Sequence, residues 1–115
     1  MAVTTIWHNP RCSKSRETLA LLTDRGIVPT VRLYLQDPPI EAEIRAALGA
    51  LGAPAIALMR TNEAAFKDLG LTVDTDDATL VAAMAGHPAL IERPLVLHGG
   101  RARLGRPPEA VLDLF

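Results

Sequence analysis

Three segments at the start of the chain follow one another in an order that leaves few possible folds. β-Branched and apolar residues predict a strand over residues 3–8, and residues 30–35 form a second run of the same kind. Between them, residues 13–25 predict a helix that ends at Gly26. A strand, a helix and a strand with short links form a βαβ unit, in which the crossover is right-handed and the strands are parallel.

The middle of the chain, about residues 40–86, predicts helices and no strand. Residues 41–51, about 54–59, 64–69 and 75–85 favour short helices, and joints rich in Gly, Pro or Asp separate them. We therefore expect a helical insert here rather than a continuation of the sheet.

The end of the chain returns to strands. Residues 95–98 and 101–104 predict a hairpin around Gly99-Gly100, a dipeptide that suits the positive-φ positions of a tight turn. Pro107-Pro108-Glu109 predicts the start of a last helix, because proline is tolerated in a first helical turn. The complete order is βαβ, helical insert, ββα. This order predicts an α/β thioredoxin-like fold with a four-stranded mixed sheet.

Length and charge limit the number of domains and the kinds of partner that we expect. At 115 residues we expect a single domain over residues 1–115, with the helical insert at about residues 40–86. The formal net charge of −1 favours neither nucleic acid nor an anionic membrane as a partner. The longest uncharged stretch, residues 46–59, is too short to span a bilayer, and the first residues do not resemble a signal peptide. We expect a cytoplasmic protein.

The chain has one cysteine, Cys12, which excludes an internal disulfide and a multi-cysteine zinc site, and we expect no bound metal or cofactor. Cys12 lies between a predicted strand and a predicted helix, where unpaired backbone N–H groups and the helix dipole favour a thiolate. Arg11, Lys14 and Arg16 add positive charge nearby. A buried structural cysteine is the alternative, but the polar, basic setting favours a reactive nucleophile.

Four motifs resemble those of the ArsC family, the arsenate reductases that are coupled to glutathione and glutaredoxin. They occur in the family's order and span nearly the whole chain, and the wording from Arg11 to Leu19 is most similar to the YfgD-like branch. Each motif alone is weak evidence, whereas the combination is specific. The motifs are His8-Asn9-Pro10-Arg11-Cys12-Ser13-Lys14-Ser15-Arg16, Leu58-Met59-Arg60, Glu92-Arg93-Pro94-Leu95 and Gly105-Arg106-Pro107-Pro108-Glu109.

This resemblance implies a reaction and its thiol partners. Cys12 would attack the arsenic of arsenate and displace water or hydroxide, which gives a covalent adduct. Glutathione, as co-substrate, would attack that adduct, and glutaredoxin would supply reducing equivalents until arsenite is released. His8 and Ser15 would flank the thiol and tune it or hydrogen-bond to it. A half-buried histidine at a strand end, without a catalytic role, is the alternative for His8.

The resemblance assigns oxyanion binding to Arg60, Arg93 and Arg106. Arsenate is close to a dianion at neutral pH, so a site that brings it to a thiolate must supply positive charge. Guanidinium groups suit this task, because they stay protonated and offer a planar fork to two oxygens. In a thioredoxin-like fold the loops of Arg93 and Arg106 should lie near Cys12. Three ordinary surface arginines are the alternative.

Pro94 adds a backbone prediction. X–Pro bonds are the common cis peptides, and thioredoxin-like folds have a cis-proline that faces the thiol at the start of the corresponding strand. We therefore expect the Arg93-Pro94 bond to be cis, with an ordinary trans proline at the strand entry as the alternative.

The Cys12-x-x-Ser15 motif distinguishes the remaining classes of function. Because Ser15 is not a cysteine, an external thiol must resolve any adduct on Cys12. A phosphatase-type reductase needs Cys-x5-Arg, but Thr18 stands at that place. A glutaredoxin-like thiol transferase shares Cys-x-x-Ser and the fold. An Spx-like regulator that binds RNA polymerase also shares the fold, but usually carries Cys-x-x-Cys.

Overall fold

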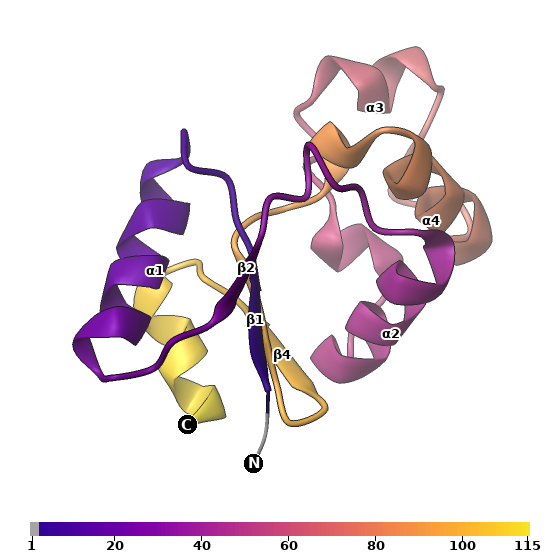
Figure 1. Cartoon of the computed structure of the whole chain (residues 1–115). Coiled ribbons are helices and arrows are strands. Elements are labelled where there is room, and N and C mark those ends of the chain that lie inside the picture. The colour runs from indigo at the N-terminus through magenta and orange to yellow at the C-terminus, as the bar shows by residue number, and fades with distance from the viewer. Residues whose placement is uncertain (1–2) are drawn as a thin grey trace. The chain divides into compact units, whose positions relative to one another are not determined.

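The computed structural model describes residues 3–115, and the chain divides into two compact units. The first, here called the sheet unit, consists of the segment that ends at Asp37 together with Arg93–Phe115. The second, the helical unit, is Pro38–Glu92. Figure 1 traces the chain through both units. The helical unit includes the range expected for the insert, about residues 40–86, and continues to Glu92. The expectation of a single domain over residues 1–115 stays a prediction.

Four strands form the sheet: β1 (Thr4–Trp7), β2 (Thr30–Arg32), β3 (Leu95–His98) and β4 (Arg101–Leu104). Their order across the sheet is β2-β1-β3-β4. β1 and β2 are parallel, whereas the β1–β3 and β3–β4 pairs are antiparallel. The predicted four-stranded mixed sheet of a thioredoxin-like fold is confirmed.

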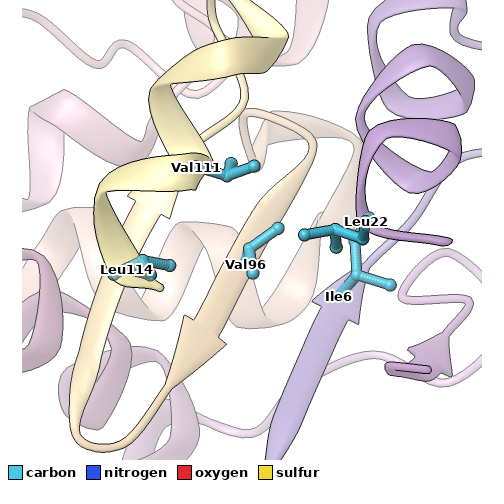
Figure 2. Close-up of a cluster of buried hydrophobic side chains, with 5 residues drawn as sticks. All are labelled: Ile6, Leu22, Val96, Val111 and Leu114. Carbon is cyan, nitrogen blue, oxygen red and sulfur yellow. The ribbon is translucent and has the colours of Figure 1, made fainter. Parts of the chain in front are cut away.

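Two helices of the sheet unit share a hydrophobic core with the central strands (Figure 2): α1 (Ser13–Asp24) and the 3₁₀ helix η3 (Pro108–Leu114). Ile6 of β1 lies opposite Val96 of β3 in the antiparallel register, so the two side chains lie on one face of the sheet. Leu22 of α1 and Val111 and Leu114 of η3 cover that pair. Burying each such side chain contributes about 1.5–3 kcal/mol. This core fixes α1 against β1, and hence the segment that joins them.

β2 is shorter than predicted, because it ends at Arg32 rather than at residue 35. The carbonyl of Leu33 accepts hydrogen bonds from the backbone N–H groups of Gln36 (3.0 Å) and Asp37 (2.8 Å), which closes a turn. Tyr34 is buried within this turn. Its aromatic side chain makes the segment resemble a strand in sequence, although its burial does not depend on strand pairing.

The hairpin and the last helix follow the prediction. β3 and β4 have the predicted bounds, and Gly99 and Gly100 join them with φ values of 58° and 80°, where any other residue would be strained. The predicted C-terminal helix is present and is a 3₁₀ helix that begins at Pro108.

The helical unit contains α2 (Glu41–Leu51), η1 (Ala55–Leu58), α3 (Ala64–Asp68), α4 (Asp77–Gly86) and η2 (Pro88–Leu90). α4 packs against α2, η1 and η2. The Asp76 carboxylate caps α4 by accepting a hydrogen bond from the backbone N–H of Thr79 over 3.0 Å. The four predicted helices are confirmed, whereas η2 and a β-bridge between Met59 and Ile91 are not predicted by the sequence. Among the described residues, no helix has the length and apolar character that crossing a membrane requires.

Candidate active site

Cys12 occupies the junction between β1 and α1. Its backbone is extended (φ −96°, ψ 123°), and it is the N-cap residue of α1. Its carbonyl accepts a hydrogen bond from the N–H of Arg16 over 3.0 Å, while its own N–H donates to the carbonyl of Asn9 over 3.0 Å. The Asn9 side chain supports the same turn, because its Oδ1 accepts a hydrogen bond from the backbone N–H of Arg11 over 3.0 Å. The predicted position of the thiol at a helix N-terminus is confirmed.

The surroundings of Cys12 favour the thiolate, although the residue is only 8% exposed. Burial raises the pKa of the thiol. The backbone N–H groups of Ser15 and Lys14 and the charges of Arg93 and Arg106 lower this pKa, and the net shift is downward. A structural cysteine in apolar surroundings would have a raised pKa instead. The thiol is therefore more acidic than an ordinary cysteine, and the predicted nucleophilic role of Cys12 stays a prediction.

Arg106 brings a guanidinium group to the sulfur. Its Nη2 donates to Sγ of Cys12 over 3.9 Å, and its Nε donates to the carbonyl of Arg93 over 3.0 Å. Because the guanidinium is planar with fixed N–H directions, the bond to Arg93 orients the group that faces the thiol. The structure thus brings together three of the predicted site residues, and two of them come from the opposite end of the chain from Cys12.

Each of these two arginines is followed by a cis-proline. The Arg93-Pro94 bond is cis, as predicted, and the Arg106-Pro107 bond is also cis, which the sequence does not predict. The backbone N–H of Gly105 donates to the carbonyl of Pro94 over 2.9 Å. This bond joins the segment that carries Arg93 to the segment that carries Arg106.

His8 and Ser15 form a buried pair beside the thiol loop. Nδ1 of His8 and Oγ of Ser15 are 2.6 Å apart, and the backbone N–H of Asn9 donates to the same Oγ over 3.0 Å. Burial lowers the pKa of His8, and the positive charge of Arg16 lowers it further. A neutral imidazole ring can accept a hydrogen bond at Nδ1 from the Ser15 hydroxyl, which gives both groups a partner. The pair therefore ties the end of β1 to the first turn of α1.

Arg60 lies in the helical unit and contacts carboxylates there. Its Nη1 is hydrogen-bonded to Oε1 of Glu63, and its Nε is 4.0 Å from Oε1 of Glu92. Its backbone N–H donates to the carbonyl of Leu90 over 2.8 Å. Arg60 is thus held by contacts within the helical unit, and its predicted role in oxyanion binding stays a prediction.

Arg16 has a structural role that the sequence reasoning missed. The sequence indicates only a nearby charge, whereas in the structure Nη1 of Arg16 donates to the carbonyl of Pro10 over 2.9 Å. This bond joins the first turn of α1 to the loop before it and holds the turn that precedes Cys12. A basic residue four positions after an N-cap cysteine, following an Asn-Pro turn, is a signal that could have suggested this contact.

Comparisons with known proteins agree with the geometry. The sequence model of the ArsC family matches residues 7–114. An arsenate reductase of Haemophilus influenzae is 47% identical over 112 residues, covering 96% of this chain and 97% of that protein. Escherichia coli YfgD, a protein whose name states no function, is 49% identical over 111 residues, covering 95% and 93%. The solved structure of an arsenate reductase from Vibrio cholerae superposes with a TM-score of 0.94 at 49% identity and covers 98% of both chains. The chain belongs to the ArsC family.

Proposed function

We propose that this protein reduces arsenate to arsenite through the thiolate of Cys12, with glutathione and glutaredoxin as its thiol partners. The observation that carries the proposal is the placement of Cys12 at the N-terminus of α1 with the Arg106 guanidinium 3.9 Å from its sulfur. A nucleophile and a cation for the oxyanion stand side by side. Relatives that share nearly the full length of the chain are named arsenate reductases.

The first step forms a bond between sulfur and arsenic. The Cys12 thiolate attacks arsenic, and a proton-assisted hydroxide leaves as water, which gives a thiol–arsenate adduct that is still As(V). Repulsion between the thiolate and the oxyanion opposes this step. Arg93 and Arg106 offset the repulsion, because their charges already lower the pKa of Cys12 and their guanidinium groups can donate to arsenate oxygens. We assign Arg60 to the oxyanion as well.

The electrons then come from external thiols. The glutathione thiolate forms a second sulfur–arsenic bond, and a protonated oxygen leaves arsenic as water. A glutaredoxin thiolate attacks the glutathione sulfur, so that a sulfur–sulfur bond forms, the electron pair of the sulfur–arsenic bond passes to arsenic, and arsenic becomes As(III). Water releases arsenite from Cys12. Ser15, which stands where a resolving cysteine would be, is fully buried and hydrogen-bonded to His8, and the chain has no second cysteine.

A depression next to the loop that precedes Cys12 is consistent with the binding of an external peptide thiol. Its volume is about 230 Å³. One wall is the loop that leads to Cys12, and Arg11 and Gln36 supply a cation and an amide that suit the carboxylates and peptide groups of glutathione. We propose the cytoplasm as the compartment, since the reaction needs a reduced thiol pool.

A coupled assay tests this proposal. Purified protein, arsenate, glutathione, glutaredoxin, glutathione reductase and NADPH should show arsenate-dependent NADPH oxidation, and thioredoxin alone should support little. Cys12→Ser is the control for the nucleophile. If arsenate gives no turnover while glutathionylated substrates are still reduced through Cys12, the protein is a thiol transferase. If neither reaction occurs and the protein binds RNA polymerase, it is a regulator.

A further inference from the structure

Gly105 is the point at which three segments of the proposed site meet. It is buried between the end of β4 and Arg106. Its N–H donates to the carbonyl of Pro94, which follows Arg93. A Cβ at position 105 would lie 2.4 Å from Oγ1 of Thr18 in α1 and 2.7 Å from Cγ of Pro94. Three segments therefore pack against one another at Gly105, where there is no room for a side chain. They are the helix that follows Cys12, the cis-proline segment and the turn that carries Arg106.

Space, rather than backbone conformation, requires glycine at this position. Gly105 is not among the glycines with positive φ, unlike Gly99 and Gly100. Its backbone conformation is thus open to other residues, whereas the volume around it is not. Real Cβ atoms essentially never approach another heavy atom to 2.4 Å, so an added methyl group must displace something.

The neighbours of Gly105 cannot yield easily. Oγ1 of Thr18 donates a hydrogen bond to the carbonyl of Lys14 over 2.8 Å, which holds its rotamer, and Thr18 is fully buried. The Pro94 ring is rigid, and its carbonyl is bonded to Gly105 itself. The turn that carries Arg106 is partly exposed and is the part that would move. Movement there acts directly on the contact between Arg106 and Cys12.

We infer that Gly105 is a positioning residue: its missing side chain lets the Arg106 turn seat against Thr18 and Pro94, so that the guanidinium reaches the Cys12 sulfur. This inference rests on the proposed role of Arg106 in arsenate reduction. It adds that the side chain of Arg106 does not alone set the distance between its guanidinium and the Cys12 sulfur. Thr18 of α1, six residues after Cys12, also sets this distance through its contact with Gly105.

Gly105→Ala is the direct test. Because a misplacement of about 1 Å can cost about 100-fold in rate, we expect kcat/KM for arsenate to fall between about 10- and 100-fold. We also expect the pH midpoint of Cys12 alkylation to rise, since Arg106 moves away from the thiolate. Gly49→Ala is the matched control: Gly49 also lacks positive φ, but a Cβ there meets no atom within 4 Å, so rate and midpoint should not change.

A second variant separates the steric contact from general damage. Thr18→Ala alone should cost less than about threefold in kcat/KM, because it removes one hydrogen bond within α1. In Gly105→Ala/Thr18→Ala the clash with Oγ1 of Thr18 is gone, while the 2.7 Å approach to Cγ of Pro94 remains, so kcat/KM should recover in part over Gly105→Ala, and the alkylation midpoint should return part of the way toward the original value. If Gly105→Ala does not fold, as judged by circular dichroism, the double variant should restore a folded and reactive protein.

Three results would overturn the inference. The first is a folded Gly105→Ala with unchanged rate and alkylation midpoint. The second is a loss of rate without any change of midpoint, and the third is a double variant that recovers neither folding nor rate. Failure of the proposed function looks different, because the original protein would then reduce no arsenate while the alkylation midpoints still responded to Gly105→Ala and to its suppression.

Discussion

Arg106 and Arg60 carry the same charge into two different surroundings. Arg106, in the sheet unit, directs Nη2 to the sulfur of Cys12 and Nε to a backbone carbonyl. Arg60, in the helical unit, contacts the carboxylates of Glu63 and Glu92. The charge of the first lowers the pKa of the Cys12 thiol, whereas the charge of the second is partly balanced by anions. Residue type and motif alone do not distinguish these roles, but the neighbours do.

The largest effect should come from removing the partner of Arg106. Cys12→Ser should abolish arsenate reduction in the coupled assay, because a serine hydroxyl stays protonated at neutral pH and is a far poorer nucleophile. Residual arsenate-dependent turnover in this variant would mean that Arg106 faces a thiol that is not the nucleophile.

Loss of the guanidinium beside the thiol should come next. Arg106→Ala should lower kcat/KM for arsenate by about 100-fold, the usual cost of one donor to a developing anion. It should also raise the pH midpoint of Cys12 alkylation above that of the unchanged protein, which we expect to lie below the midpoint of an ordinary cysteine. Lysine should rescue only partly. Arg101→Ala, in an exposed position on β4, is the control and should change neither quantity.

Arg60→Ala should have a smaller effect and a different one. We expect about a tenfold fall in kcat/KM, mainly through KM, because a partly balanced cation contributes to binding more than to the reacting thiolate. The charges that lower the pKa of Cys12 belong to Arg93 and Arg106, so the alkylation midpoint should stay in place. A midpoint that moves as far as in Arg106→Ala would break the comparison.

Ser15→Ala should affect stability more than rate. It removes the partner of Nδ1 of His8, in a buried pair, and of the backbone N–H of Asn9, which is partly buried. Leaving buried polar groups unsatisfied costs about 1–3 kcal/mol in the free energy of unfolding, which urea denaturation can measure. Arsenate turnover should fall only a few-fold. A complete loss of turnover in a stable Ser15→Ala protein would assign the hydroxyl a direct chemical role.

Glu63→Gln should have the smallest effect and tests the Arg60 side of the comparison. Both side chains of this pair are about one-third exposed, so the pair contributes at most about 1 kcal/mol to stability. Removing the carboxylate charge should leave Arg60 more available to an oxyanion and lower KM for arsenate by about twofold. An increase in KM of that size would show that Glu63 orients Arg60 for binding.

The sequence was most informative where local chemistry decides the structure. The hairpin at Gly99-Gly100 has the predicted bounds because its turn needs positive φ, and Cys12 is the N-cap of α1 because a strand and a helix are joined there by a short turn. β2 was predicted too long, since Tyr34 is buried in a turn that backbone hydrogen bonds to Leu33 create. Alternating apolar residues cannot reveal such bonds.

The rest of the site depends on contacts between distant parts of the chain. The tight fit of Gly105 against Thr18 and Pro94 involves three segments and leaves no mark in any one of them. The contact of Arg60 with Glu63 spans three residues and is visible in the sequence, whereas that with Glu92 is not. The resemblance to the ArsC family supplied the arginines as candidates, but only the structure shows that Arg106 donates to Cys12.

The contact between Cys12 and Arg106 spans 94 positions of the chain. During synthesis the cysteine leaves the ribosome long before the arginine that helps to acidify it. Until the C-terminal segment has folded onto α1, the thiol lacks that neighbour and has an acidity closer to that of a cysteine in a peptide. A nascent or truncated chain should thereby be less exposed to adventitious oxidation and alkylation, because the thiol reaches its full acidity only when the C-terminal segment is in place.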